Sequence, residues 1–279
     1  KDRRQGRSLT GVKDPNEKAD TLFVHPDIRR MLMEAKAFTE GMRAFALWGG
    51  FQSDLAHNAS TPEERQTADD LLSLLMPVIK GYGTDKGYEV CTNMQQVFGG
   101  HGYVEEWGMS QRVRDARIAQ IYEGANGIQA LDLVGRKLPA HGGRAIQAFF
   151  ALVASECASA KGKPELDKVA TALESALGDL QGSTMWLMAN AMINPDNAGA
   201  GSVAYMHMTG VVALGLMWLR MAVAADAALQ AGSDDGDFMQ AKLVTARFYA
   251  DHVMPETVSL RRKLEAGSET IMELPIAAF

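Results

Sequence analysis

Cysteine is scarce in this 279-residue chain, which has only Cys91 and Cys157, far apart in the sequence. Two such residues form neither a disulfide framework nor the paired spacing of a metal site, so we expect no bound metal. Free cysteines of cytoplasmic proteins are commonly buried and reduced, and we predict that state for both. The stretch 1–7 is charged and no apolar run follows it, so no secretory signal is expected and the predicted location is cytoplasmic.

Basic residues do not outnumber acidic ones: 28 Lys and Arg face 34 Asp and Glu, for a net charge of −6. This balance excludes a broad positive surface for nucleic acid, although a local pocket can still bind phosphate groups. The apolar fraction of 47% and the charged fraction of 22% are typical of a soluble globular protein with a substantial core.

Long apolar runs are nearly absent, with one exception at 203–219, which approaches the length of a membrane span. His207 and Thr209 interrupt this run, and Arg220 ends it. A helix buried on all sides in a protein core has the same composition. We favour that interpretation over a membrane span.

Strand patterns are also lacking, because no run of alternating β-branched residues is bounded by tight turns. Apolar residues from Ile28 onward recur at steps of three and four, which predicts a helix from about 25 to 57. The sequence TPEE at 61–64 is a capping box that begins a second helix. We expect Pro77 to kink that helix and nearby glycines to weaken it before it ends at the glycines of 99–102.

The remainder of the chain is predicted to be helical as well, so the fold class is all-α. The expected helices are 112–122, 128–138, 144–161, 164–191, 201–231 and 236–264. Pro139 and the Gly142–Gly143 pair mark a boundary, which predicts one helical domain at 1–138 and a second helical bundle at 139–279.

Three features between Gln96 and Lys137 suggest chemistry. Three glycines follow the second helix at 99–102, and basic residues cluster around Asp115, where an ion-pair network is expected. Glu123 follows an apolar stretch and precedes Gly124, so partial desolvation of its carboxylate is expected, which raises a carboxyl pKa. Simpler interpretations remain open: a glycine helix cap, a surface ion-pair network and a solvated or capping glutamate.

Two segments of this region together resemble the acyl-CoA dehydrogenase family. The string RDARI at 114–118, followed by IYEGAN at 121–126, resembles the C-terminal signature of that family. The string QVFGGHGY at 96–103 resembles a second family segment at the expected spacing. Further stretches at 2–6, 24–30 and 127–137 resemble the branch with an additional C-terminal helical domain, which includes 3-methylmercaptopropionyl-CoA dehydrogenases.

The resemblance implies α,β-dehydrogenation of an acyl-CoA thioester to a trans-2-enoyl-CoA, with FAD as cofactor. Glu123 aligns with the base that removes the α-proton, and its backbone N–H with a donor to the thioester oxygen. Gly124 aligns with a substrate-contacting position. Implied FAD contacts are Ala125, Asn126 and Gly127 in one turn, Gln96, Gly99 and Gly100 towards a neighbouring subunit, and Arg3 at the pyrophosphate. Arg3 could instead belong to a solvated basic terminus.

The implied partners are an acyl-CoA substrate, electron-transfer flavoprotein as electron acceptor and further copies in a homo-oligomer. Two departures from the family pattern stand out. Ala125 replaces the usual threonine, which removes a hydroxyl that can bond the flavin. No counterpart of the family's N-terminal helical domain or middle β-domain is found, so a domain fragment or a separate subunit, inactive and flavin-free by itself, is expected. The alternatives are a non-catalytic helical assembly module and an acyl-CoA oxidase.

Overall fold

The computed structural model describes residues 2–279, so only Lys1 lies outside the described part. Within it the chain is helical, and its one β-bridge, between Arg4 and Thr21, extends into no strand. The predicted all-α class is confirmed. The main helices are α1 (Pro26–Asn58), α2 (Pro62–Val97), α3 (Gly100–Tyr103), α4 (Met109–Ala119), α5 (Asn126–Asp132), α6 (Arg144–Ala160), α7 (Pro164–Asn190), α8 (Asp196–Gln230), α9 (Gly236–His252), α10 (Glu256–Glu265) and α11 (Glu269–Glu273).

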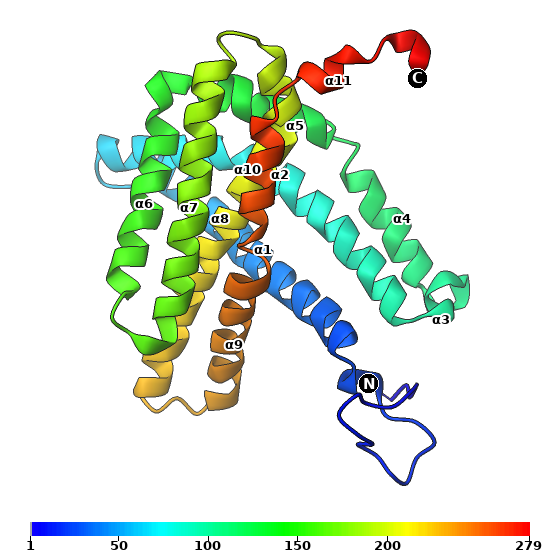
Figure 1. The fold of residues 1–279 in the computed structure, drawn as a ribbon. Coiled ribbons are helices and arrows are strands. Elements are labelled where there is room, and N and C mark those ends of the chain that lie inside the picture. Colours follow the sequence, from blue (N-terminus) through cyan, green and yellow to red (C-terminus); the bar gives the residue numbers. More distant parts are fainter. Residues whose placement is uncertain (1) are drawn as a thin grey trace.

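Helices α6 to α10 form a bundle from which the N-terminal half of α1 and the α2–α4 pair extend to one side (Figure 1). Helix α8 is the central element, since it contacts α1, α2, α5, α6, α7, α9 and α10. It is the one helix of residues 2–279 long and apolar enough to cross a membrane, and 78% of its apolar window is buried inside the protein. The preference for a buried core helix is thus supported.

One hydrophobic core runs through both predicted domains. Phe45 and Leu133 from the first and Phe149 and Trp218 from the second belong to the same buried cluster. The indole Nε1 of Trp218 donates a hydrogen bond of 3.0 Å to the carbonyl of Ala37 in α1. Cys157 is fully buried, and burial raises its thiol pKa to about 12, whereas Cys91 is only half-buried.

Helix α2 begins at the predicted capping box: Thr61 accepts from the amide of Glu64, whose carboxylate accepts from the amide of Thr61. The helix stays unbroken through Pro77 and its glycines, and Figure 1 shows its direction changing between its two halves. The glycines permit close packing rather than weakening the helix. A Cβ at Gly81 would lie 2.3 Å from the sulfur of Met206.

Several helix boundaries differ from the predictions: α8 begins at Asp196 and not at 201, and α5 ends at Asp132 and not at 138. The expected helix 236–264 is split into α9 and α10, because Pro255 has no N–H to donate and disfavours helical geometry in the residue before it. The expected helix 112–122 is α4, which ends at Ala119, so that the following residues enter an irregular loop.

The N-terminal loop is organised around Asp20, whose side chain is inaccessible to solvent. Its carboxylate accepts hydrogen bonds from the amides of Ser8, Lys13 and Asp14 and pairs with Arg7. The bond from Ser8 has the largest effect, and together these donors outweigh burial and lower the pKa of Asp20 from 3.8 to about 2.

Acidification is therefore expected to loosen this loop in a defined window. Because the pKa is lower in the folded state, Asp20 stabilises the loop above about pH 4, and this contribution disappears as the pH falls towards 2. The amide NMR signals of Ser8, Lys13 and Asp14 should shift together in that window. In Asp20→Asn the same amides should show no such transition, and a wild-type transition in this variant would contradict the assignment.

Candidate active site

The predicted base lies in the loop that joins α4 to α5. The amide of Asn126 donates to the carbonyl of Gln120 at 3.1 Å, which closes the loop over the five residues between them. Glu123 adopts φ = 56° and Gly124 φ = 82°, so two consecutive residues are left-handed. This conformation is costly for a glutamate and persists only where the surroundings enforce it.

The carboxylate of Asp85 in α2 binds both ends of this loop. One oxygen, Oδ1, accepts from the side-chain amides of Gln120 at 2.7 Å and Asn126 at 2.6 Å. The other, Oδ2, lies 2.8 Å from Nε2 of His207 in α8. Burial raises the pKa of Asp85, but the bonds from His207, Gln120 and Asn126 outweigh it and hold this pKa below its usual value. Asp85 is therefore an ionised acceptor at neutral pH.

Lys80, just over one turn before Asp85 in α2, holds the middle of the loop. Its ammonium donates to the carbonyl of Gly124 and to the side-chain oxygen of Asn126, both at 2.7 Å. The side-chain amide of Gln129 donates to the carbonyl of Glu123 at 3.2 Å. The loop is thus fixed from α2 and α5, while its backbone N–H at Glu123 makes no hydrogen bond within residues 2–279.

Glu123 itself is exposed, which contradicts the expected desolvation of its carboxylate by this chain. The apolar residues before it do not cover it, because Ile118, Ile121 and Tyr122 are each more than half exposed. An exposed apolar group next to a conformationally constrained acid is a surface suited to contact with another domain, subunit or ligand.

The basic cluster on α4 does not form the expected network around Asp115. Arg114 instead forms a two-pronged ion pair with Glu105, at 2.8 and 3.1 Å, and Arg117 donates to Gln120 at 2.9 Å. Asp115 has no ion pair within the described residues. The reason is geometric: the loop before α4 places Glu105 opposite Arg114 in a forked arrangement that a neighbour on the same helix cannot match.

The second predicted group lies at the turn after α2. Gly99 has φ = 60° and ψ = −145°, a conformation open essentially to glycine alone. The guanidinium of Arg3 donates to the carbonyl of Phe98 at 2.7 Å and lies 2.9 Å from Nδ1 of His101. The Arg3 side chain therefore lies against the turn of Gly99 and Gly100 and adds a positive charge to it.

These two groups lie at opposite ends of α4 (Figure 1). At about 1.5 Å per residue, the 11 residues of α4 separate them by roughly 16 Å. The structure therefore brings Arg3 to the Gly99 turn, and it keeps both apart from Glu123. Gln96 is exposed on the last turn of α2, on the side of the Gly99 turn.

The predicted flavin-contacting residues next to Glu123 differ in how far they are exposed to solvent. Ala125 and Gly127 are exposed, whereas the side chain of Asn126 is buried. Its amide nitrogen donates to Gly81, Thr84 and Asp85, and its oxygen accepts from Lys80 and Thr84. The Asn126 side chain thus holds the loop in place and has no free polar atom for a ligand.

Two features of these groups bear on the predicted flavin dinucleotide. At the Gly99 turn, the Arg3 guanidinium can bind phosphate oxygens, and Gly100 leaves open space for close approach. At the other end of α4, the exposed backbone of Ala125–Gly127 lies next to the exposed carboxylate of Glu123. FAD stays a prediction for these residues.

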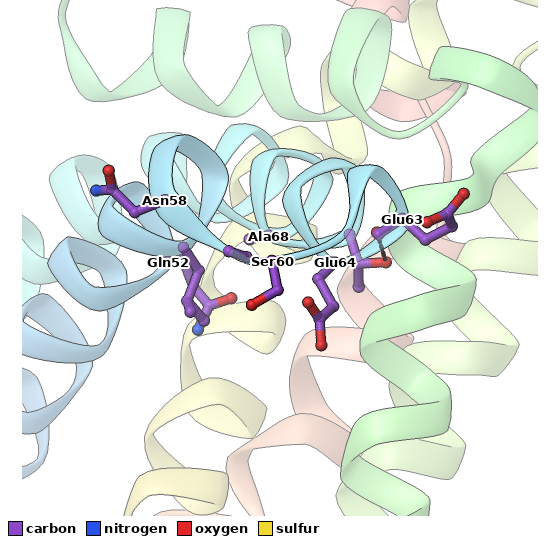
Figure 2. Close-up of a pocket in the computed structure, with 9 residues that line it drawn as sticks. Gln52, Asn58, Ser60, Glu63, Glu64 and Ala68 are labelled. Atoms are coloured by element: carbon purple, nitrogen blue, oxygen red, sulfur yellow. Dashed lines mark hydrogen bonds between the residues drawn. The ribbon is translucent and has the colours of Figure 1, made fainter.

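A separate hollow lies away from both groups. It has a volume of about 650 Å³ and is lined by the end of α1, the 59–60 link and the first turns of α2, including Gln52, Ser60 and Glu64 (Figure 2). It is open to solvent and contains none of the predicted site residues. We therefore locate the candidate site by the loop geometry and not by cavity size.

Sequence reasoning missed Lys80, Asp85 and His207. A partial signal existed for α2, because Lys80 and Thr84 share one helical face at a step of four and the acidic Asp85 follows directly. His207 was visible as a polar interruption of the apolar run in α8. Only the folded chain shows that these residues, distant in sequence, meet at the Glu123 loop.

Comparison with known proteins gives two family matches. Residues 6–138 match "Acyl-CoA dehydrogenase, C-terminal domain", and residues 145–275 match "Acetyl-CoA dehydrogenase C-terminal like". A 3-methylmercaptopropionyl-CoA dehydrogenase of Ruegeria pomeroyi is 39% identical over 98% of this chain and 46% of its own length. The broad-specificity linear acyl-CoA dehydrogenase FadE5 of Mycobacterium tuberculosis is 34% identical over 100% of this chain and 47% of its own length.

Solved structures show the same fold. Caenorhabditis elegans ACDH-11 in complex with C11-CoA superposes with a TM-score of 0.71 at 20% identity, covering 92% of this chain and 42% of that one. Acyl-CoA oxidase 1 of Yarrowia lipolytica gives 0.63 at 16% identity, covering 97% and 42%. The chain spans about half the length of these relatives. With both of its parts matched, this chain belongs to the acyl-CoA dehydrogenase family, corresponding to the C-terminal region of its members.

Proposed function

We propose that the complete protein is an FAD-dependent acyl-CoA dehydrogenase in which Glu123 removes the substrate α-proton. The observation that supports this most strongly is the loop of 120–126, which α2 and α5 hold so that Glu123 is left-handed, exposed and next to a free backbone N–H. A purely structural turn has no need of a glutamate in this costly conformation. Relatives named as dehydrogenases support the same assignment.

In the proposed reaction the carboxylate of Glu123 takes the α-proton of the thioester, and the electron pair left at the α-carbon forms the double bond to the β-carbon. Bound FAD supplies the acceptor for the β-hydrogen, which leaves as hydride. The backbone N–H of Glu123 is free to donate to the thioester oxygen as negative charge develops there. Because an α C–H is a weak acid, we expect bound substrate and flavin to shield the Glu123 carboxylate from water.

Gly124 follows the base directly and is proposed to contact substrate. Ala125, Asn126 and Gly127 are proposed to approach the flavin, with Asn126 acting through its backbone because its side chain is engaged. The turn of Arg3, Gly99 and Gly100, with Gln96 beside it, is proposed to bind the flavin of a neighbouring subunit. This requires a homo-oligomer, and we further propose a cytoplasmic protein that passes electrons to electron-transfer flavoprotein.

The test uses the protein expressed from its complete reading frame. FAD should co-purify, and anaerobic addition of straight-chain acyl-CoAs or 3-methylmercaptopropionyl-CoA should bleach the flavin absorbance. Slow reoxidation by oxygen would identify a dehydrogenase, and fast reoxidation would identify the oxidase alternative. The fold does not separate the two, because an acyl-CoA oxidase shares it. A protein that contains no flavin and no acyl-CoA activity would instead be the non-catalytic assembly module.

The 279-residue chain by itself is predicted to be flavin-free and inactive. The proposed flavin-contacting turns are exposed and lie about 16 Å apart along α4, so each offers only part of a binding site. Absorbance at visible wavelengths after purification measures this directly. Stoichiometric FAD bound to the isolated chain would contradict the prediction.

A further inference from the structure

One polar side chain of the central helix α8 reaches the Glu123 loop network. His207 lies 2.8 Å from Oδ2 of Asp85 through its Nε2, and its ring packs edge-on against Tyr82, with centroids 5.5 Å apart. Both His207 and Asp85 are largely buried, with about a fifth of each side chain exposed. Since Asp85 is ionised, Nε2 is the donor in this bond.

The position of His207 is set by an unusually close crossing of α2 and α8. A Cβ at Gly210 would lie 2.3 Å from Cγ of Tyr82, and one at Gly81 would lie 2.3 Å from the sulfur of Met206. Both contacts are possible only because glycine occupies these positions. The two helices are therefore locked together just where His207 faces Asp85.

The bond from His207 constrains the orientation of the Asp85 carboxylate. The two oxygens of a carboxylate are rigidly connected, so a donor that holds Oδ2 also determines where Oδ1 points. Oδ1 is the atom that accepts from Gln120 and Asn126, the residues at the two ends of the loop. Without the imidazole, the carboxylate can rotate, and the loop loses its common anchor.

We infer that His207 is a positioning residue, which orients Asp85 so that the 120–126 loop presents Glu123 in its left-handed conformation. The catalytic meaning of this inference rests on the proposed function, whereas the positioning itself does not. It gives the region 139–279 a direct part in shaping the site, because His207 is a residue of α8 in the additional helical bundle.

Two substitutions separate the hydrogen bond from the packing of the ring. His207→Phe keeps an aromatic ring against Tyr82 but has no N–H donor. His207→Gln places an amide N–H near the position of Nε2 and can restore the bond to Asp85. Hydrogen–deuterium exchange is measured on the protein expressed from its complete reading frame, for peptides covering 118–127 and, as an internal control, α6, α7 and α9.

We expect His207→Phe to raise the exchange rate of the loop peptide about tenfold, the scale set by loss of one hydrogen bond to a charged group. The control peptides should keep their wild-type rates, and His207→Gln should return the loop to near the wild-type rate. Unchanged loop exchange in His207→Phe would overturn the inference. Equal loss of protection in all peptides, or no restoration by glutamine, would also overturn it, because His207 would then support the fold in general.

This experiment is independent of the activity of the protein. Loop exchange reports on the His207–Asp85 link whether or not Glu123 is a base. Failure of the proposed function would appear as a lack of acyl-CoA-dependent flavin bleaching, with the exchange result unaffected.

Discussion

Glu123→Gln in the protein expressed from its complete reading frame is expected to slow acyl-CoA-dependent flavin reduction by about 10²–10⁴-fold, the range for removal of a general base. Glutamine preserves the size and the hydrogen-bonding shape of the side chain but cannot accept the α-proton. Anaerobic stopped-flow absorbance measures the rate of bleaching. The flavin content and the Kd for acyl-CoA should change little, because the loop is held by other groups.

Glu106→Gln provides the matched control, since Glu106 is also an exposed glutamate close to α4 and forms no ion pair within the described residues. It should reduce its flavin at the wild-type rate. Flavin bleaching at a near wild-type rate in Glu123→Gln would contradict the assignment of Glu123 as the base.

Trp218→Ala is expected to lower the free energy of unfolding by about 3–5 kcal/mol, because it empties a fully buried site. The substitution also removes the indole N–H that donates to the carbonyl of Ala37 in α1. Urea denaturation followed by circular dichroism measures the loss. Trp218→Phe, which keeps most of the packing, should cost clearly less, and the exposed Trp107→Ala should change stability by no more than about 0.5 kcal/mol.

Trp218→Ala also tests whether the regions on either side of the predicted boundary at 138–139 unfold separately. Trp218 joins α8 to α1 within one buried cluster, so we expect one cooperative transition that moves as a whole to lower urea. Two transitions, of which only the one for 139–279 responds to Trp218→Ala, would show that the two regions unfold separately.

Much of the fold could be predicted from the sequence because its signals are local. The capping box at Thr61 and the period of apolar residues after Ile28 define α1 and α2 without reference to the rest of the chain. The apolar pattern continues through Pro255 and predicts one long last helix. The proline interrupts the helical hydrogen bonds, so the structure has two helices there.

The site was less accessible to prediction. The glycines around Glu123 predict that it lies in a break between two helices. They do not predict that its side chain is exposed. The apolar residues before it suggested burial, and they face outward in this chain. The hydrogen bonds that hold the loop connect Asp85, Asn126 and His207 across long sequence separations, and no local pattern reports such contacts.

This chain is similar both to proteins named dehydrogenases and to proteins named oxidases. Caenorhabditis elegans ACDH-11 and a Yarrowia acyl-CoA oxidase share this helical arrangement at 20% and 16% identity. The proposed role of Glu123 in removing the α-proton suits both a dehydrogenase and an oxidase, since these enzymes differ in what reoxidises the flavin.

The role of Glu123 is tested most directly by α-hydrogen exchange in deuterated water. An acyl-CoA analogue with oxygen in place of the β-carbon has no β-hydrogen to lose, so proton removal is observed without hydride transfer. With the complete wild-type protein, mass spectrometry should show deuterium entering the α-position, and with Glu123→Gln this exchange should fall by at least about 100-fold. Exchange at equal rates in the two proteins would contradict the assignment of Glu123 as the base.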